Sequence, residues 1–131
     1  MNNSEEKRIL LVDEDLFLLD IYSRRLRGKG FDVEIAINEE DARKMIKEKG
    51  CGMVVLDVLI GDKPGLDVLA RLKKENEAGA CAFVVLTNSA HSKNSEKALS
   101  LGADAYIVKA HNTPEEVAEE LEKIYHSKRA N

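Results

Sequence analysis

The chain has 131 residues, a formal net charge of −4 and a sequence pI near 5.5. This length suits one globular domain, and we expect residues 1–131 to form a single domain with a core from about 7 to 127. Lysine and arginine are scattered among glutamate and aspartate, which argues against a nucleic-acid-binding face. The first apolar run is too short for a signal peptide or a membrane span, so we expect a cytoplasmic protein with no membrane partner.

Short apolar runs alternate with helical patterns through the first half of the chain. The runs at 9–12 and 53–56 are continuous, which indicates strands buried on both faces. Residues 31–35 alternate apolar and acidic side chains, as an edge strand would. The predicted elements are strands at 9–12, 31–35 and 53–56, a helix at 16–27, and a helix capped by Asn38 that ends at Gly50.

The second half continues the same alternation. Residues 58–63 are a predicted loop, after which Pro64 suits the first turn of a helix. The two remaining apolar runs end in polar residues, at Thr87 and Lys109. The predicted elements are strands at 82–86 and 106–108, and helices from Pro64 to about Asn76, from about Asn94 to Leu101, and from Thr113 with an apolar face of Val117, Leu121 and Ile124.

This order amounts to five β-α units with no linker between them. It predicts the α/β class, with one parallel sheet, helices on both faces and right-handed crossovers. In such sheets the ligand binds at the carboxyl ends of the strands. Residue 57 follows a central strand, so Asp57 is expected to lie where the chemistry takes place.

The two cysteines occupy equivalent places before two strands. Cys51 and Cys81 each lie six residues before a polar strand end, so adjacent parallel strands would make them neighbours. Two cysteines are too few for a disulfide framework, and we interpret both as small core residues in a reducing environment. A bridge between them is the alternative.

Four predicted strands end in polar residues that a parallel sheet would bring to one edge. Three carboxylates at one edge repel one another, and Mg²⁺ offsets this repulsion because it prefers carboxylates, a carbonyl and waters. Asp57 is then a candidate nucleophile toward a phosphoryl group, while a lysine neutralises charge and a hydroxyl positions an oxygen. The residues are Asp13 and Glu14 after the first strand, Asp57 after the third, Thr87 after the fourth and Lys109 after the fifth.

The same stretches resemble the receiver domain of two-component response regulators, over essentially the whole chain. They are Ile9-Leu10-Leu11-Val12-Asp13-Glu14-Asp15, Val54-Val55-Leu56-Asp57, Val84-Val85-Leu86-Thr87 and Tyr106-Ile107-Val108-Lys109. The resemblance implies a flavodoxin-like, doubly wound (βα)5 three-layer sandwich with strand order 2-1-3-4-5. It also implies a single-domain switch, similar to chemotaxis regulators, in which Asp57 accepts a phosphoryl group from a histidine kinase or phosphotransfer protein.

The resemblance further implies roles for individual residues and surfaces. A phosphoryl group adds a charge of about −1.5 to −2, which would alter the loop after Thr87, the short fourth helix and the last strand. A downstream protein would bind the fourth helix, the last strand and the fifth helix, and this surface is the output if the chain is complete. The matched residues are Asp13, Glu14, Asp57 and the backbone carbonyl of Leu59 for Mg²⁺ or Mn²⁺, Asp57, Thr87 and Lys109 for the phosphoryl group, and Thr87 and Tyr106 for the switch.

Several positions depart from the family pattern without removing a residue that the chemistry requires. These departures affect the geometry of the metal site, the shape of the loop after Asp57, access to Asp57 and the way in which Lys109 is presented. They are Glu14 as the second acid, Gly61, Pro64 and Gly65 where the loop usually has proline and aspartate-glycine, Asn88 in place of a small residue, and Ala110 in place of a cis proline.

Three other functions compete with the switch. A haloacid-dehalogenase-like phosphatase needs a second aspartate two residues after the nucleophile, where this chain has Leu59. A flavin-binding domain needs a glycine- and hydroxyl-rich first loop rather than the acidic residues 13–15. A receiver-fold adaptor that is never phosphorylated is the third alternative. We expect the switch, which is not an enzyme beyond catalysing its own phosphorylation and slow dephosphorylation.

Overall fold

A computed structural model describes residues 7–60, 63–76 and 81–130. Strands and helices alternate through these ranges, which confirms the predicted α/β class. The strands are β1 (Arg8–Val12), β2 (Asp32–Ala36), β3 (Met53–Leu56), β4 (Leu59–Ile60), β5 (Lys63–Pro64), β6 (Ala82–Thr87) and β7 (Ala105–Val108). The helices are α2 (Leu16–Gly28), α3 (Glu39–Lys49), α4 (Gly65–Glu75), α5 (Ser92–Ser100) and α6 (Pro114–Ala130), with a 3-10 turn, η1 (Lys109–His111).

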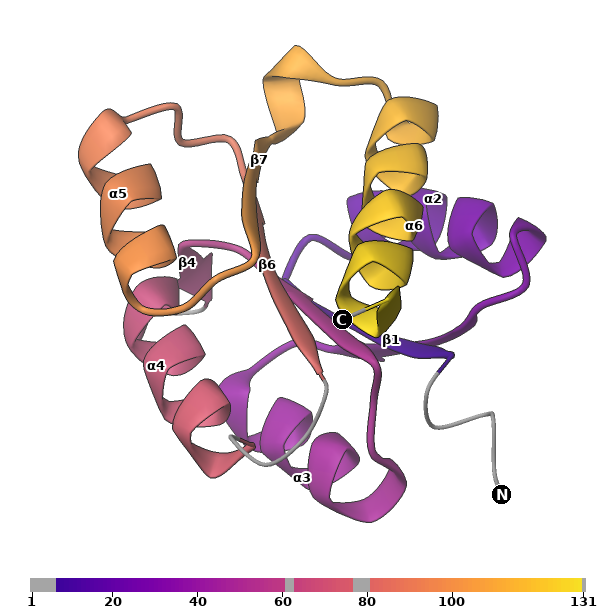
Figure 1. Cartoon of the computed structure of the whole chain (residues 1–131), viewed down its shortest axis with the longest axis horizontal. Coiled ribbons are helices and arrows are strands. Elements are labelled where there is room, and N and C mark those ends of the chain that lie inside the picture. The colour runs from indigo at the N-terminus through magenta and orange to yellow at the C-terminus, as the bar shows by residue number, and fades with distance from the viewer. Residues whose placement is uncertain (1–6, 61–62, 77–80, 131) are drawn as a thin grey trace.

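The main sheet is parallel, with its five strands in the order β2-β1-β3-β6-β7 (Figure 1). Counted within this sheet, the order is 2-1-3-4-5, which confirms the flavodoxin-like prediction. The strand β2 lies at an edge, as its alternating pattern predicted. Val12 of β1 pairs with Leu56 of β3, and Leu56 pairs with Val85 of β6. Because the strands are nearly flush, the residues that follow them emerge at one edge of the sheet.

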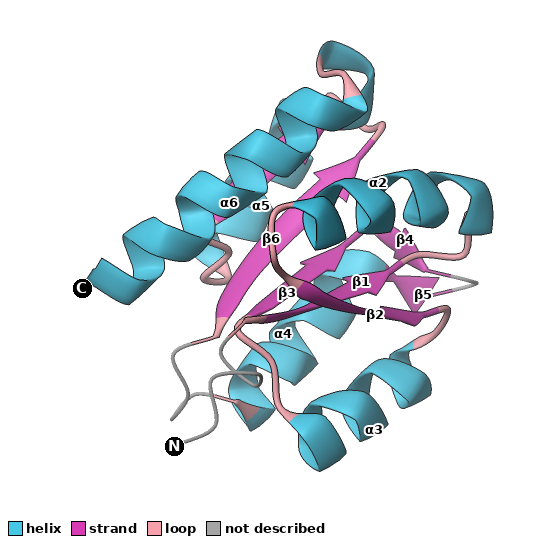
Figure 2. Ribbon diagram, turned by 90° about the vertical axis from the view of Figure 1, so that its right-hand side faces the viewer, coloured by secondary structure: helices cyan, strands magenta, loops and turns pink. Residues whose placement is uncertain are grey.

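Helices cover both faces of the sheet, which gives the three layers (Figure 2). The helices α2 and α6 pack on one face, and α3, α4 and α5 pack on the other. Successive strand residues point to opposite faces, so Val55 joins the core under α2 and α6 while Val54 joins the core under the other three helices. Both faces need apolar residues, which explains the continuous apolar runs in the sequence.

The segment between β3 and α4 differs from the predicted loop. Leu59–Ile60 and Lys63–Pro64 pair antiparallel as a small hairpin of β4 and β5, while residues 61–62 lie outside the described ranges. Pro64 occupies the N-cap position of α4 in an extended conformation, so the prediction that it begins the helix is wrong. Proline is tolerated there because a cap residue makes no helical N–H bond.

The helix α5 begins earlier than the sequence predicted. The expected start was near Asn94, but the helix begins at Ser92 because His91 caps it. The Nδ1 atom of His91 accepts a hydrogen bond from the backbone N–H of Lys93 at 3.2 Å. Sequence reasoning missed this start because histidine is an uncommon cap residue.

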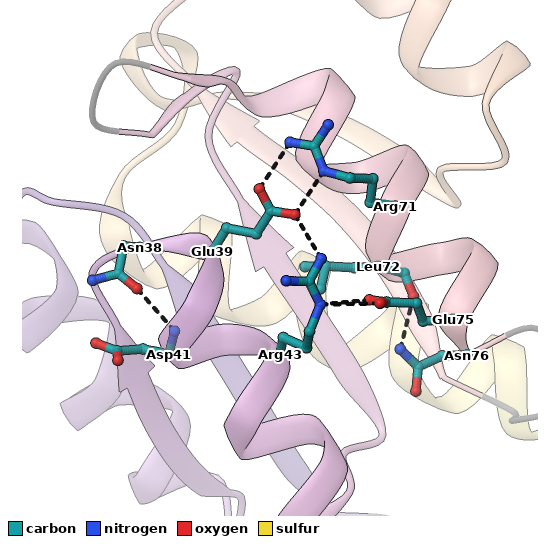
Figure 3. A network of polar contacts seen from close by, with 8 residues as sticks. All are labelled: Asn38, Glu39, Asp41, Arg43, Arg71, Leu72, Glu75 and Asn76. Carbon is teal, nitrogen blue, oxygen red and sulfur yellow. Dashed lines mark hydrogen bonds and ion pairs between the residues drawn. The ribbon is translucent and has the colours of Figure 1, made fainter.

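A polar network joins α3 to α4 (Figure 3). Glu39 is only 3% exposed, and its carboxylate accepts hydrogen bonds from Arg71 at 2.7 and 2.8 Å and from Arg43 at 2.9 Å. Arg43 also reaches the carboxylate of Glu75 at 3.0 Å. Glu39 lies in the first turn of α3, where an acidic residue favours the helix dipole. Buried in the fold, this carboxylate also requires charged partners, and they tie the two helices together.

Candidate functional site

Polar side chains from four strand ends meet at the carboxyl edge of the main sheet. Asp13 follows β1, Asp57 follows β3, Thr87 ends β6 and Lys109 follows β7. Hydrogen bonds connect the four side chains in a row: Thr87 donates to Asp57, and Lys109 donates to both Asp57 and Asp13. The structure therefore brings together four of the five residues predicted to share this edge.

Lys109 lies at the centre of this group and is buried. Its Nζ atom donates to Asp13 Oδ2 at 2.7 Å and to Asp57 Oδ2 at 3.1 Å. Burial acts to lower the pKa of Lys109, but the hydrogen bond to Asp13 and the charge of Asp57 outweigh it, so the net pKa is raised. The side chain is therefore an ammonium that balances two carboxylates.

The carboxylate of Asp57 is held on both oxygens and remains open to solvent on one side. Its Oδ1 atom accepts a hydrogen bond from the hydroxyl of Thr87 and another from the N–H of Val58 at 2.6 Å. The side chain is 17% exposed, compared with 7% for that of Lys109. An oriented carboxylate that is within reach of solvent is suited to attack an electrophile.

The acidic pair after β1 is divided between the interior and the surface. Asp13 is buried, and its Oδ1 atom accepts the N–H of Asp15 at 3.1 Å, whereas Glu14 is exposed. Asp13 and Asp57 face the same ammonium, and their oxygen chemistry fits a hard cation such as Mg²⁺. No group of three metal-binding side chains occurs among the described residues. The ligand roles of Asp13, Glu14, Asp57 and the Leu59 carbonyl therefore all stay predictions.

The start of α4 packs directly against the backbone of Asp57. The N–H of Gly65 donates to the carbonyl of Val58 at 2.5 Å. A Cβ atom at Gly65 would lie 1.8 Å from the backbone oxygen of Asp57, a distance that no side chain can occupy. A glycine is therefore required at residue 65 to set the position of the nucleophile.

A second row of contacts runs from Thr87 to β7 and α5. The hydroxyl oxygen of Thr87 accepts the N–H of Ser89 at 3.3 Å, and the hydroxyl of Tyr106 donates to the carbonyl of Ser89 at 2.7 Å. Asn94 of α5 donates to the hydroxyl of Ser89 at 2.8 Å. Sequence reasoning named Thr87 and Tyr106 but missed Ser89, because the polar segment around it has no periodicity to single it out.

The turn after β7 presents the lysine without a cis peptide. Residues Lys109–His111 form the 3-10 turn η1, and the bond before Ala110 is trans, like the other described peptide bonds. Asn112 closes the turn by donating through its backbone to Lys109 and through its side chain to Val108. A trans peptide bond before Ala110 is therefore compatible with the hydrogen bonds of Lys109 to the carboxylates of Asp13 and Asp57.

The family model described as "Response regulator receiver domain" matches residues 9–122. The chain belongs to this family. A receiver domain protein (CheY-like) from Methanospirillum hungatei JF-1 superimposes with a TM-score of 0.84 at 28% identity, over 94% of this chain and 96% of that one. A two-component response regulator from Clostridium difficile gives a TM-score of 0.81 at 22% identity, covering 91% and 95%. The chemotaxis response regulator CheY4 of Vibrio cholerae gives 0.80 at 19%, covering 89% and 97%.

Membership of the receiver family indicates the general role of the protein. Receiver domains are signalling switches of two-component systems that interact with histidine kinases or phosphotransfer proteins, and the family generally binds Mg²⁺ at the phosphorylation site. Among the described residues, none of the helices has the length and apolar character needed to span a membrane.

Proposed function

We propose that this receiver domain accepts a phosphoryl group on Asp57 from a histidine kinase or phosphotransfer protein. The observation that carries the proposal is the solvent-facing carboxylate of Asp57 in hydrogen-bond contact with both Thr87 and Lys109. Asp13, Glu14, Asp57 and the Leu59 carbonyl would hold Mg²⁺ or Mn²⁺. In this proposal, residues 1–131 act as one cytoplasmic receiver domain.

The proposed transfer needs no general base, because an ionised carboxylate is already a nucleophile. An oxygen of Asp57 bonds to phosphorus while the bond from phosphorus to the donor's histidine nitrogen breaks, and that nitrogen keeps the electron pair. A bound divalent cation would supply neutralisation of the negative charge. Lys109 is positioned to bind one phosphoryl oxygen, and the hydroxyl of Thr87 is positioned to bind another.

The contacts of Ser89 support a route from the modified aspartate to the surface. When the hydroxyl of Thr87 turns toward a phosphoryl oxygen, its contact with the Ser89 N–H changes. Ser89 also holds the hydroxyl of Tyr106 and the side chain of Asn94. The added charge of about −1.5 to −2 would therefore alter β7 and α5 together.

We assign the downstream partner to the surface formed by α5, β7 and α6. An open groove of about 560 Å³ lies along β7, η1 and α6, and Tyr106 lines it. Glu116, Glu119 and Glu120 lie on the α6 side of the same groove. Lys123 also lines the groove, but the carboxylates outnumber it, which favours a partner segment that carries basic residues. Because Tyr106 contacts both Ser89 and this groove, movement of the tyrosine would change the binding surface.

Intact-mass measurement after incubation with Mg²⁺ and acetyl phosphate tests the proposal. The wild type is expected to gain one phosphoryl group only when the metal is present, and Asp57→Asn is expected to gain none. Asp20→Asn, which alters an exposed carboxylate of α2, is the matched control and should be labelled like the wild type.

A label on another residue, or no label in the folded wild type, would contradict the proposal. The absence of any label would favour the adaptor function. Steady turnover of a phosphomonoester would instead indicate a phosphatase of the haloacid-dehalogenase kind.

A further inference from the structure

The two cysteines lie together at the amino ends of neighbouring strands. Cys51 precedes β3 and Cys81 precedes β6, and these two strands pair in the main sheet. Both are free thiols, with their sulfur atoms 3.3 Å apart. A disulfide bond is about 2.05 Å long, so closing it needs an approach of only about 1 Å. The backbone already joins the two sites, because the N–H of Ala82 donates to the carbonyl of Gly52 at 3.0 Å.

The surroundings give the two thiols different reactivity. Cys51 is partly exposed, whereas Cys81 is buried. The hydrogen bond between the two sulfur atoms lowers the pKa of Cys51, and the charges of Arg8 and Arg129 add to this effect while burial opposes it. The same hydrogen bond, together with burial, raises the pKa of Cys81. Cys51 is therefore placed to react with an external oxidant, and Cys81 is placed to react with Cys51.

We propose that Cys51 and Cys81 are a redox-sensitive pair that hydrogen peroxide converts into a reversible intramolecular disulfide. The thiolate of Cys51 attacks one peroxide oxygen, the O–O bond breaks, and hydroxide leaves, so that Cys51 becomes a sulfenic acid. The sulfur of Cys81 then attacks the sulfur of Cys51, the S–O bond breaks, and the leaving hydroxide takes the proton of Cys81. The two thiols lose two electrons and two protons, and peroxide is reduced to two waters.

The cross-link would form at the edge of the sheet opposite the candidate phosphoacceptor. The strands β3 and β6 lead to Asp57 and Thr87 at their other ends, so the disulfide would join the two strands without covering Asp57. It would also close a loop of 30 residues and restrict the unfolded chain. Oxidation should therefore raise the thermal unfolding temperature. This inference does not depend on whether Asp57 is phosphorylated.

Intact-mass measurement of the reduced full chain after mild peroxide treatment and alkylation tests the inference. We expect a mass loss of about two units, from two hydrogen atoms, with no alkyl label and full reversal by dithiothreitol. Peptide mapping without reduction should show Cys51 joined to Cys81 in a monomer, and the unfolding temperature should rise by several degrees. Gain of oxygen without a cross-link, a dimer joined between chains, or a pair still fully alkylated would overturn the inference.

Two variants assign the role of each thiol. Cys81→Ser should accumulate a sulfenic acid at Cys51 that dimedone traps, because no second thiol can displace it. Cys51→Ser should leave the buried Cys81 unoxidised over the same time. If dimedone instead labels Cys81 in Cys51→Ser and does not label Cys51 in Cys81→Ser, the assigned roles are reversed and this part of the inference is overturned. Peptide mapping of the wild type decides the cross-link even if a variant does not fold.

Discussion

The ammonium of Lys109 donates a hydrogen bond to Asp13 at 2.7 Å, although the two residues are 96 positions apart in the chain. The same ammonium reaches Asp57 at 3.1 Å, so one buried cation balances carboxylates from two other strand ends. This ammonium offsets the repulsion between the two carboxylates. If Asp13 and Asp57 hold Mg²⁺ as proposed, the ammonium competes with the cation for their oxygens.

Lys109→Met should therefore bind Mg²⁺ more tightly than the wild type while losing phosphorylation. Removal of the ammonium leaves the carboxylates of Asp13 and Asp57 without their cation. We expect the Mg²⁺ affinity to rise by about 3- to 10-fold, or roughly 1 kcal/mol, as measured by isothermal titration calorimetry. The yield of phosphorylated protein from acetyl phosphate should fall sharply. Lys47→Met, an exposed change on α3, is the control, and an unchanged affinity in Lys109→Met would refute the competition.

Gly65→Ala should destabilise the protein by about 2–4 kcal/mol, as measured by urea unfolding. The new Cβ would lie 1.8 Å from the backbone oxygen of Asp57 and 2.7 Å from the carbonyl carbon of Val58, so the start of α4 must move. Gly28→Ala is the matched control, because a Cβ at Gly28 meets no atom within 4 Å. That control should stay within about 1 kcal/mol of the wild type. Equal stability of the two variants would contradict the close approach at Gly65.

Glu39→Ala should cost about 2–4 kcal/mol of unfolding free energy. The substitution removes a buried carboxylate that accepts hydrogen bonds from Arg43 and Arg71 and joins α3 to α4. Glu75→Ala is the control in the same network, since the side chain of Glu75 is 47% exposed and its ion pair is worth about 1 kcal/mol or less. Chemical denaturation should separate the two variants. A larger loss for Glu75→Ala than for Glu39→Ala would be inconsistent with the burial of Glu39.

Tyr106→Phe should loosen the segment after Thr87 while costing only about 1 kcal/mol of global stability. The change removes a single hydrogen bond, from the tyrosine hydroxyl to the carbonyl of Ser89. Amide hydrogen exchange should become faster in residues 88–93 and stay unchanged in β1 and β3. Tyr125→Phe is the control, because this tyrosine belongs to α6 and packs on the other face of the sheet. Unchanged exchange in residues 88–93 would show that Tyr106 does not hold this segment.

Local patterns in the chain are sufficient to predict the class of fold and the edge at which the polar residues meet. The apolar runs ending at Val12, Leu56 and Leu86 are continuous because both faces of the sheet are covered, and each run can be recognised from neighbouring residues alone. Polar residues that follow parallel strands emerge at one edge of the sheet, so the order of the elements already places Asp57 and Lys109 at the same edge. The apolar and polar patterns of single elements thus predict the α/β class, whereas the strand order was implied by the family resemblance.

The packing of the layers settles which polar groups are buried and what they contact. It places Asp13 inside and Glu14 outside, makes Glu39 a link between two helices, and brings Cys51 to within 3.3 Å of Cys81. The physical reason is that a polar side chain acquires its role from partners far away in the chain. No local periodicity records those partners, because hydrogen bonds and ion pairs depend on distances that exist only after the layers have packed.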